Sequence, residues 1–493
     1  MNPALVLPVV DLRPLLPMLV LAATAVVVIL LDLLPPRERK DHLGFVSALG
    51  VVLTLIMTYW MTFSIGGGEL RGFRGMVVLD PYALFFNVVI GYATGLVILL
   101  SMDYIRREGQ EAGEFYILVL LSSLGMMLMA SAGDLIIVFL GLETMSIALY
   151  VLTGFFRHRL DAGEASMKYF LMGAFASGFF LYGIALIFGA TGSTNLDRIA
   201  NAVAAGAGRD PMLVIGFGLL LVGFGFKISS VPFHMWAPDA YEGAPTSITA
   251  FIATGSKAAA FASLLRVLMT ALRGAPLDWP MLMWGMAAVT MTVGNVVALA
   301  QQNIKRMLAY SSIAHAGYLL VALVAHSDVG TSAFLFYLAA YTLMTLGAFG
   351  IVIVLGEKGT ENTSISRDYA GIAWRHPLLA AAMALFMFSL TGIPPTAGFV
   401  GKFAILSAAV RAGHVPLAIL LVLASVISAY FYLKVVVSMY MWTSDRVPIR
   451  SRVPAMAAIA LLIVVVGVLG LGIFPGSWVD LARSSSTGLP GLP

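Results

Sequence analysis

Charged side chains interrupt several long apolar segments of this chain. A carboxylate, Glu143, stands near the middle of the stretch 134–156. A charge at the centre of a bilayer costs about 2.5 to 3.5 kcal/mol on insertion scales, so such groups mark ion paths by default. Lysine and glutamate exchange protons, and proton transfer is therefore the chemistry that we expect. Five of the eight lysines stand in such segments: Lys168, Lys227, Lys257, Lys402 and Lys434.

The position of each charged group along its predicted membrane segment separates a role in proton transfer from a purely structural role. Lys227 and Lys257 are central in their segments and cannot easily extend to a boundary, which favours function. Glu143 has no basic residue within a helical turn; the alternative is a protonated glutamate bonded to a backbone carbonyl. Lys168 lies nearer one end, where snorkelling or an ion pair competes with an auxiliary role. Lys434 follows three aromatic residues and is interpreted as an interfacial anchor.

Two predicted helices are broken in the middle, beside the buried charges. Ser229, Ser230 and Pro232 follow Lys227, and the run Thr391-Gly-Ile-Pro-Pro-Thr-Ala-Gly398 precedes Lys402. Proline removes an amide donor and frees carbonyls, and broken helices of this kind line polar cavities in transporters. Lys402 is therefore a functional candidate.

Other polar residues carry weaker signals. His234 and His315 titrate near neutral pH and are auxiliary candidates for the proton path, although buried histidines often only form hydrogen bonds. Lys305, next to Arg306, lies at a predicted loop boundary and is interpreted mainly as a topology signal.

The elements that position these residues are membrane-spanning helices. The 493 residues are 60% hydrophobic and 11% charged, with a mean hydropathy of +0.94. A spanning helix needs about 20 apolar residues, and barrel strands would alternate in character, which these stretches do not. We predict an all-α integral membrane protein with about fourteen spans, at approximately 12–34, 43–64, 79–102, 113–131, 133–156, 162–190, 211–236, 246–271, 280–301, 305–325, 330–355, 377–411, 415–442 and 453–474.

Loop charges predict the orientation, because Lys and Arg accumulate on the cytoplasmic side. With fourteen spans, both termini lie outside, and the first apolar stretch is a retained helix rather than a signal peptide. The basic joints are those with Arg37, Arg39 and Lys40; Arg106 and Arg107; Arg157 and Arg159; Lys305 and Arg306; Lys358, Arg367 and Arg375; Arg446, Arg450 and Arg452.

Composition also excludes several classes of function. The chain has no cysteine, which excludes disulfides, thiolate iron–sulfur clusters and cysteine-based zinc sites. It has no phosphate-binding loop, dinucleotide fingerprint or basic stripe for nucleic acid, so a soluble-type enzyme and a nucleic-acid partner are not expected. We predict no cofactor and no metal in this chain.

Three motifs carry a family resemblance that covers essentially the whole chain. The runs are Val231-Pro-Phe-His-Met-Trp-Ala-Pro-Asp-Ala-Tyr-Glu-Gly-Ala-Pro-Thr246 with Ser256-Lys-Ala-Ala259, Gln302-Asn-Ile-Lys-Arg-Met-Leu-Ala-Tyr-Ser-Ser-Ile-Ala-His315, and Gly392-Ile-Pro-Pro-Thr-Ala-Gly-Phe-Val-Gly-Lys402. Together they resemble the subunit N family of proton-pumping NADH:quinone oxidoreductase, respiratory complex I, within the antiporter-like superfamily.

The resemblance implies a fold and roles for the candidates. It implies fourteen helices with two inverted five-helix repeats, helices 4–8 (residues 111–272) and 9–13 (278–443), each with one broken helix. Helices 1–3 (1–110) precede them, and helix 14 with a tail (444–493) follows, in a single membrane domain. By resemblance, Glu143 and Lys227 form an intramembrane pair, Lys257 is the central relay, and Lys402 lies in the second half-channel. The auxiliary residues are Lys168, His234 and His315.

The resemblance also implies the surroundings. FMN, iron–sulfur clusters and quinone are expected in partner subunits, and the neighbours are the M-type, K-type and J-type membrane-arm subunits, with lipids and protons. The location is the bacterial inner membrane. Two alternatives stay open: a subunit of a multisubunit cation/proton antiporter or related membrane-bound hydrogenase, and a purely structural membrane scaffold.

Overall fold

The protein is an almost entirely helical bundle. The computed structural model describes residues 11–34, 40–110, 113–273, 278–359, 361, 363–443 and 453–489. Within these residues, thirteen helices are long and apolar enough to cross a membrane. The predicted span 377–411 is split into the shorter apolar helix α17 (Pro377–Thr391) and α18 (Ala397–Arg411). The structure thus confirms an all-α membrane fold and agrees with the expectation of about fourteen spans.

Three helices and a short hairpin open the chain. These are α1 (Leu16–Asp32), α2 (Asp41–Ile65), the antiparallel strands β1 (Leu70–Gly72) and β2 (Val77–Leu79), and α3 (Pro81–Arg107). Leu70 pairs with Leu79 in the hairpin. Asp80 caps α3 by accepting a hydrogen bond from the backbone N–H of Ala83, which satisfies one of the free amides of the first turn.

The next part of the bundle contains the first broken helix. Its elements are α4 (Gly113–Ala130), α5 (Leu135–Thr153), α6 (Leu160–Thr191), α7 (Leu196–Ala204), α8 (Pro211–Ile228), α9 (Trp236–Gly243), α10 (Thr246–Phe251), a π-helical turn (Ile252–Ser256) and α11 (Lys257–Thr270). The span expected over 211–236 ends at Ile228, because Ser229 adopts a left-handed conformation with φ +59°.

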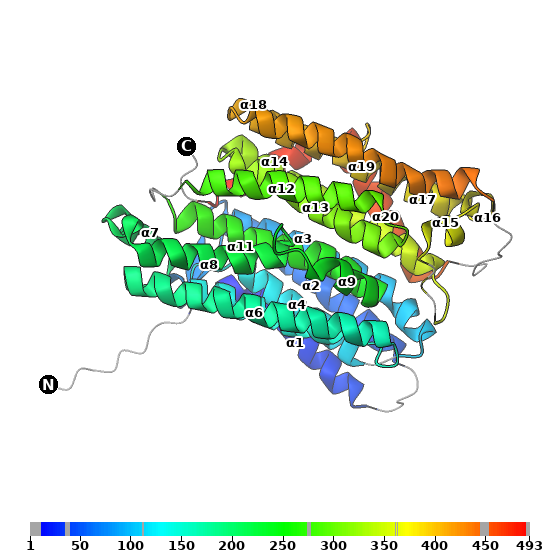
Figure 1. Cartoon of the computed structure of the whole chain (residues 1–493). Helices are drawn as coiled ribbons and strands as arrows, with labels where there is room; N and C mark the ends of the chain where they lie inside the picture. Colours follow the sequence, from blue (N-terminus) through cyan, green and yellow to red (C-terminus); the bar gives the residue numbers. More distant parts are fainter. Residues whose placement is uncertain are drawn as a thin grey trace.

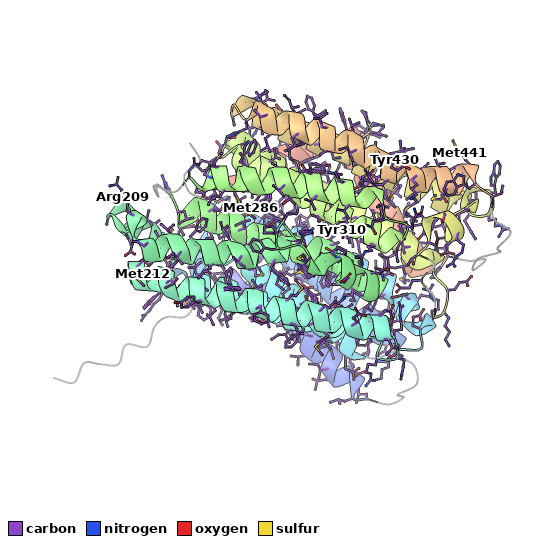
Figure 2. All side chains as sticks on the ribbon, viewed as in Figure 1. Arg209, Met212, Met286, Tyr310, Tyr430 and Met441 are labelled. Carbon is purple, nitrogen blue, oxygen red and sulfur yellow. The ribbon has the colours of Figure 1, made fainter. Side chains whose placement is uncertain are left out.

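The remaining helices complete the bundle. They are α12 (Trp279–Leu299), α13 (Ile304–Val324), α14 (Asp328–Leu355), α15 (Ile365–Asp368), α16 (Ile372–Arg375), α17, α18, α19 (Val415–Met441), α20 (Ala455–Ile473) and α21 (Gly476–Ser486). The segment 246–270, α13 and α14 are almost completely buried, whereas α1, α6, α19 and α20 are largely exposed. Apolar side chains such as Tyr430 and Met441 project outward from α19, as a lipid-facing surface requires (Figure 2).

The long helices run side by side, with α7 at one end of the bundle and α15 and α16 at the other (Figure 1). Loops predicted to be cytoplasmic meet at the second end, where Arg159 lies 3.4 Å from Glu361 and the N–H of Gly359 donates to Glu108. The basic residues at 37, 39, 446, 450 and 452 lie outside the described residues.

A repeated backbone pattern occurs at the two ends. Asp134 forms an isolated bridge with Asn195, and Asn303 forms one with Ser364. Each bridge joins the start of a long helix, α5 or α13, to the start of a short one, α7 or α15, which Figure 1 places at opposite ends. This pattern supports an inverted duplication, and the exact repeat ranges stay a prediction.

Candidate functional site

Lys227 lies in an aromatic cage at the end of α8. Its side chain is 3% exposed, and its Nζ is 5.1 Å from the ring centre of Tyr150, 5.2 Å from that of Tyr169 and 5.4 Å from that of Phe226. The Nζ also donates a weak hydrogen bond to the Tyr150 hydroxyl at 3.4 Å. Aromatic faces stabilise a cation while keeping water away, so the cage holds the lysine without a carboxylate.

Glu143 and Lys227, both among the described residues, are not in ion-pair contact. The Glu143 carboxylate is half-buried and accepts a hydrogen bond from the Ser177 hydroxyl of α6. Tyr150, seven residues further along α5, contacts the lysine instead. The expected closed pair is therefore absent in this structure, because each partner is already held by a different group.

Lys257 is the centre of a hydroxyl cluster that joins four helices, α9, α11, α13 and α14. It begins α11 directly after the π-helical turn and is 1% exposed. Its Nζ donates to the backbone carbonyl of Ser312 at 2.8 Å and to the Ser312 hydroxyl. The same hydroxyl accepts a hydrogen bond from Tyr341 at 2.9 Å and lies 3.4 Å from the hydroxyl of Tyr241.

His315 occupies the next turn of α13 and is fully enclosed by tyrosines. Its Nδ1 is 2.6 Å from the Tyr337 hydroxyl, and its Nε2 is 3.0 Å from the Tyr432 hydroxyl. The imidazole also packs against the ring of Tyr341, with 5.1 Å between centres. Histidine is thus placed next to Ser312 and its partner Tyr341, close to the Lys257 cluster.

Lys402 is held by the helix break that the sequence predicted. Gly392 ends α17 with φ +94°, a conformation that favours glycine. The carbonyls of Leu390 and Thr391 lack helical partners there, and each accepts a hydrogen bond from Lys402 Nζ at 2.9 Å. The Nζ also lies 4.8 Å from the ring centre of Tyr318, which packs 5.3 Å from the His315 ring.

The structure therefore brings Lys257, His315 and Lys402 into one buried series of polar groups. The members between them are hydroxyls that sequence reasoning missed: Ser312, Tyr341, Tyr337, Tyr432 and Tyr318. A signal for some of them was present, because Ser312, His315 and Tyr318 recur every three residues and so share one face of α13.

Two auxiliary candidates lie apart from this series. Lys168 is about half exposed and forms ion pairs with Glu164 at 2.7 Å and Asp239 at 3.0 Å. His234 is half-buried in the turn after α8, and its Nδ1 has no hydrogen-bond partner among the described residues. For Lys168 the structure thus favours the ion-pair interpretation.

Two buried ion pairs were not predicted. Lys305 is fully buried with its Nζ 2.5 Å from Glu361, so it has a structural ion pair in addition to the predicted role as a topology signal. Arg266 of α11 forms two hydrogen bonds with Asp80, at 2.8 and 2.9 Å. Glu361 lies in a loop and Asp80 precedes a helix. Because neither carboxylate interrupts an apolar run, the sequence pattern does not indicate either ion pair.

Comparison with known proteins identifies the family. Residues 132–428 match the family described as NADH:quinone oxidoreductase/Mrp antiporter, TM. The NADH-quinone oxidoreductase subunit N of Trichlorobacter lovleyi is 46% identical over 487 residues, which cover 98% of this chain and 99% of that protein. The subunit N of Chloroflexus aggregans is 43% identical, and the match covers 99% of this chain and 100% of that protein. The chain belongs to the NADH-quinone oxidoreductase subunit N family.

Solved structures agree with a subunit N fold. A chain of respiratory complex I from Thermus thermophilus with bound aureothin is 36% identical, with a TM-score of 0.80, over 95% of this chain and 99% of that one. A chain of the Mrp complex from Dietzia has a TM-score of 0.87 over 97% of this chain and 98% of that one, at 20% identity, which shows the fold alone. The subunit N resemblance of the sequence is thus confirmed.

Proposed function

We propose that this chain is the N-type proton-translocating subunit of a bacterial NADH:quinone oxidoreductase in the inner membrane. The observation that carries the proposal is the buried series from Lys257 to Lys402. Hydrogen bonds join Lys257, Ser312 and Tyr341, and the His315 ring packs against Tyr341 and against Tyr318, whose ring faces Lys402. Redox chemistry takes place in partner subunits that hold FMN, iron–sulfur clusters and quinone. The M-type, K-type and J-type subunits are its neighbours.

Glu143 and Lys227 act as the proton switch of this chain. In the present state Lys227 is held by the aromatic cage and Glu143 by Ser177. Closing the pair favours the charged lysine, whereas opening it in a desolvated site favours proton release. Moving one charge through about 100 mV requires about 2.3 kcal/mol, which is similar to the energy that a buried ion pair gains or loses on rearrangement.

Neutral variants in the assembled complex test this function. We expect Lys227→Met and Lys257→Met to lower proton pumping in proteoliposomes by about tenfold or more, since about 1.4 kcal/mol already corresponds to a factor of ten. Lys434→Met is the matched control, because Lys434 bonds to the Gln301 carbonyl and the Gln302 side chain near the surface, away from the buried series. Normal pumping by assembled Lys227→Met and Lys257→Met complexes would refute the proposal.

Two alternatives predict different results. A structural scaffold predicts that the neutral variants impair assembly without selectively impairing pumping. A cation/proton antiporter subunit predicts exchange driven by an ion gradient without quinone reduction. The Mrp likeness concerns the fold alone at 20% identity, whereas the relatives named subunit N reach 46%, which favours the oxidoreductase.

A further inference from the structure

A buried carboxylate, Glu361, connects three distant segments at the end of the bundle that the loop charges assign to the cytoplasm. Its side chain is 6% exposed. One oxygen lies 2.5 Å from Lys305 Nζ of α13, and the other accepts a hydrogen bond from the Tyr104 hydroxyl of α3 at 2.5 Å and lies 3.4 Å from Arg159. The carboxylate is thus the common partner of two cations and a phenol.

The partners of Glu361 hold the backbone on both sides of Pro245. Lys305 Nζ donates to the carbonyl of Ala244 at 2.6 Å. The Tyr104 hydroxyl accepts a hydrogen bond from the N–H of Thr246 at 3.1 Å. The Ala244 carbonyl and the Thr246 N–H lie on either side of the break between α9 and α10. Glu361 therefore holds both sides of the break indirectly, through the side chains of Lys305 and Tyr104.

This break leads directly to Lys257. The helix runs from α10 through the π-helical turn into α11 without another interruption, and Lys257 is the first residue of α11. No side chain caps α10, and the hydroxyls of Thr246 and Ser247 are buried without a hydrogen-bond partner among the described residues. The first turn of the Lys257 helix is therefore held by the contacts from Tyr104 and Lys305, together with a hydrogen bond from the Thr249 hydroxyl to the Tyr241 carbonyl.

We propose that Glu361 is a positioning residue for Lys257, because it anchors the start of the Lys257 helix through Lys305 and Tyr104. The inference rests on the proposed proton-translocating function. A loop outside the apolar segments thereby controls the geometry of a proton carrier inside them. Removing the negative charge leaves Lys305 buried without its partner and releases both edges of the break, since charge-assisted hydrogen bonds are about twice as strong as neutral ones.

The charges around Glu361 keep it ionised. Burial alone would raise the pKa of this carboxyl, but the charges of Lys305 and Arg159, with the hydrogen bonds from Lys305 and Tyr104, hold it below its ordinary value. The groups that face the cluster are Lys305, Arg159, Tyr104, Asp161 and Tyr369. Because the folded pKa is depressed, the anchor is intact above the ordinary carboxyl pKa and is lost only as the pH falls through the lower folded value.

The test combines hydrogen exchange with proton pumping in the intact complex. We expect Glu361→Gln to increase amide exchange in the segment 244–249 about tenfold and to lower the number of protons pumped per electron at least twofold, to the same extent from pH 6 to pH 8. The conservative variant Glu361→Asp keeps the negative charge, so we expect it to reverse at least half of the increase in amide exchange and at least half of the loss in protons pumped per electron. Glu357→Gln is the matched control, because Glu357 lies in the same loop and is exposed.

The outcomes separate this inference from the proposed function. If Lys257→Met loses pumping while Glu361→Gln behaves like Glu357→Gln in both measurements, the positioning role is wrong and the function stands. If Lys257→Met pumps normally, the function itself is wrong. If Glu361→Gln does not assemble, Tyr104→Phe decides, since it keeps the Glu361 to Lys305 pair: faster exchange at Thr246 supports the anchor, and unaltered exchange overturns it.

Discussion

At the scale of single residues, hydroxyl groups determine what the buried lysines can do. A lysine without partners in the membrane is costly, and Lys257 is stabilised by the carbonyl and hydroxyl of Ser312 rather than by a carboxylate. Ser312 also accepts from Tyr341. Hydrogen-bonded networks of this kind polarise each other, so a single hydroxyl influences both the cation and the tyrosine.

The variant Ser312→Ala isolates this hydroxyl. Lys257 keeps the carbonyl of Ser312 but loses the hydroxyl, and Tyr341 loses its acceptor. An unsatisfied buried group costs about 1 to 3 kcal/mol, so we expect proton pumping to slow about five- to a hundredfold at unchanged assembly. Thr292→Val is the control, since Thr292 bonds to the carbonyl of Ala288 in its own helix, on an exposed face. Equal pumping by the two variants would contradict a role for Ser312.

At the scale of elements, close helix contacts through glycine place Glu143. A side chain added at Gly141 would lie 2.8 Å from the carbonyl of Gly125, and one added at Gly125 would lie 2.5 Å from the backbone nitrogen of Met145. Helices α4 and α5 therefore pack backbone against backbone at the level of the carboxylate. Membrane helices gain association energy from such contacts, because lipid provides no hydrophobic drive between helices.

Gly141→Ala tests the packing of α5. We expect the added methyl group to lower the free energy of unfolding by about 1 to 3 kcal/mol, because the clash is with backbone that cannot rotate away. The measurement is the thermal midpoint for loss of this subunit from the solubilised complex. Gly178→Ala in α6 is matched, since nothing lies within 4 Å of its added methyl group, and it leaves the midpoint unchanged or raises it. A midpoint for Gly141→Ala equal to that of Gly178→Ala would show that the contact is not tight.

At the scale of the whole molecule, ion pairs between segments distant in the sequence occur at the two ends of the bundle. At one end Arg159 and Lys305 converge on Glu361, and at the other Arg71 of the hairpin pairs with Asp197 of α7. Positive loop residues are retained on the cytoplasmic side, so the first end is expected to face the cytoplasm.

The absence of cysteine in the chain makes this orientation directly testable. We expect a membrane-impermeant maleimide to label Lys358→Cys of this subunit only in inside-out vesicles and Arg209→Cys only in right-side-out vesicles, because both positions are exposed and lie at opposite ends. The label is located by mass spectrometry of this subunit. Labelling of both variants in the same vesicles would disprove the topology.

Local features of the chain were predictable because they depend on neighbouring residues alone. The length of apolar runs determines which segments cross the membrane. Gly392 and Pro394 end a helix whatever the helix packs against, so the break before Lys402 was predicted. The three motifs, around Pro245 and Lys257, before His315 and before Lys402, were together sufficient to predict the subunit N family. Three of the buried lysines, Lys227, Lys257 and Lys402, were also evident, since a charge within an apolar run is costly and contrasts with its neighbours in the segment.

The tertiary structure decided which polar groups meet. Tyr432 reaches Ser311 across 121 positions, and Glu361 reaches Lys305 across 56, because helices remote in sequence pack side by side. The same packing holds Lys227 in an aromatic cage apart from Glu143. By itself, the sequence determined the helices, their breaks and their buried charges, which follow from local hydrophobicity and backbone chemistry. Only the folded bundle decided the partners of those charges, since contacts depend on how separate helices are placed around one another.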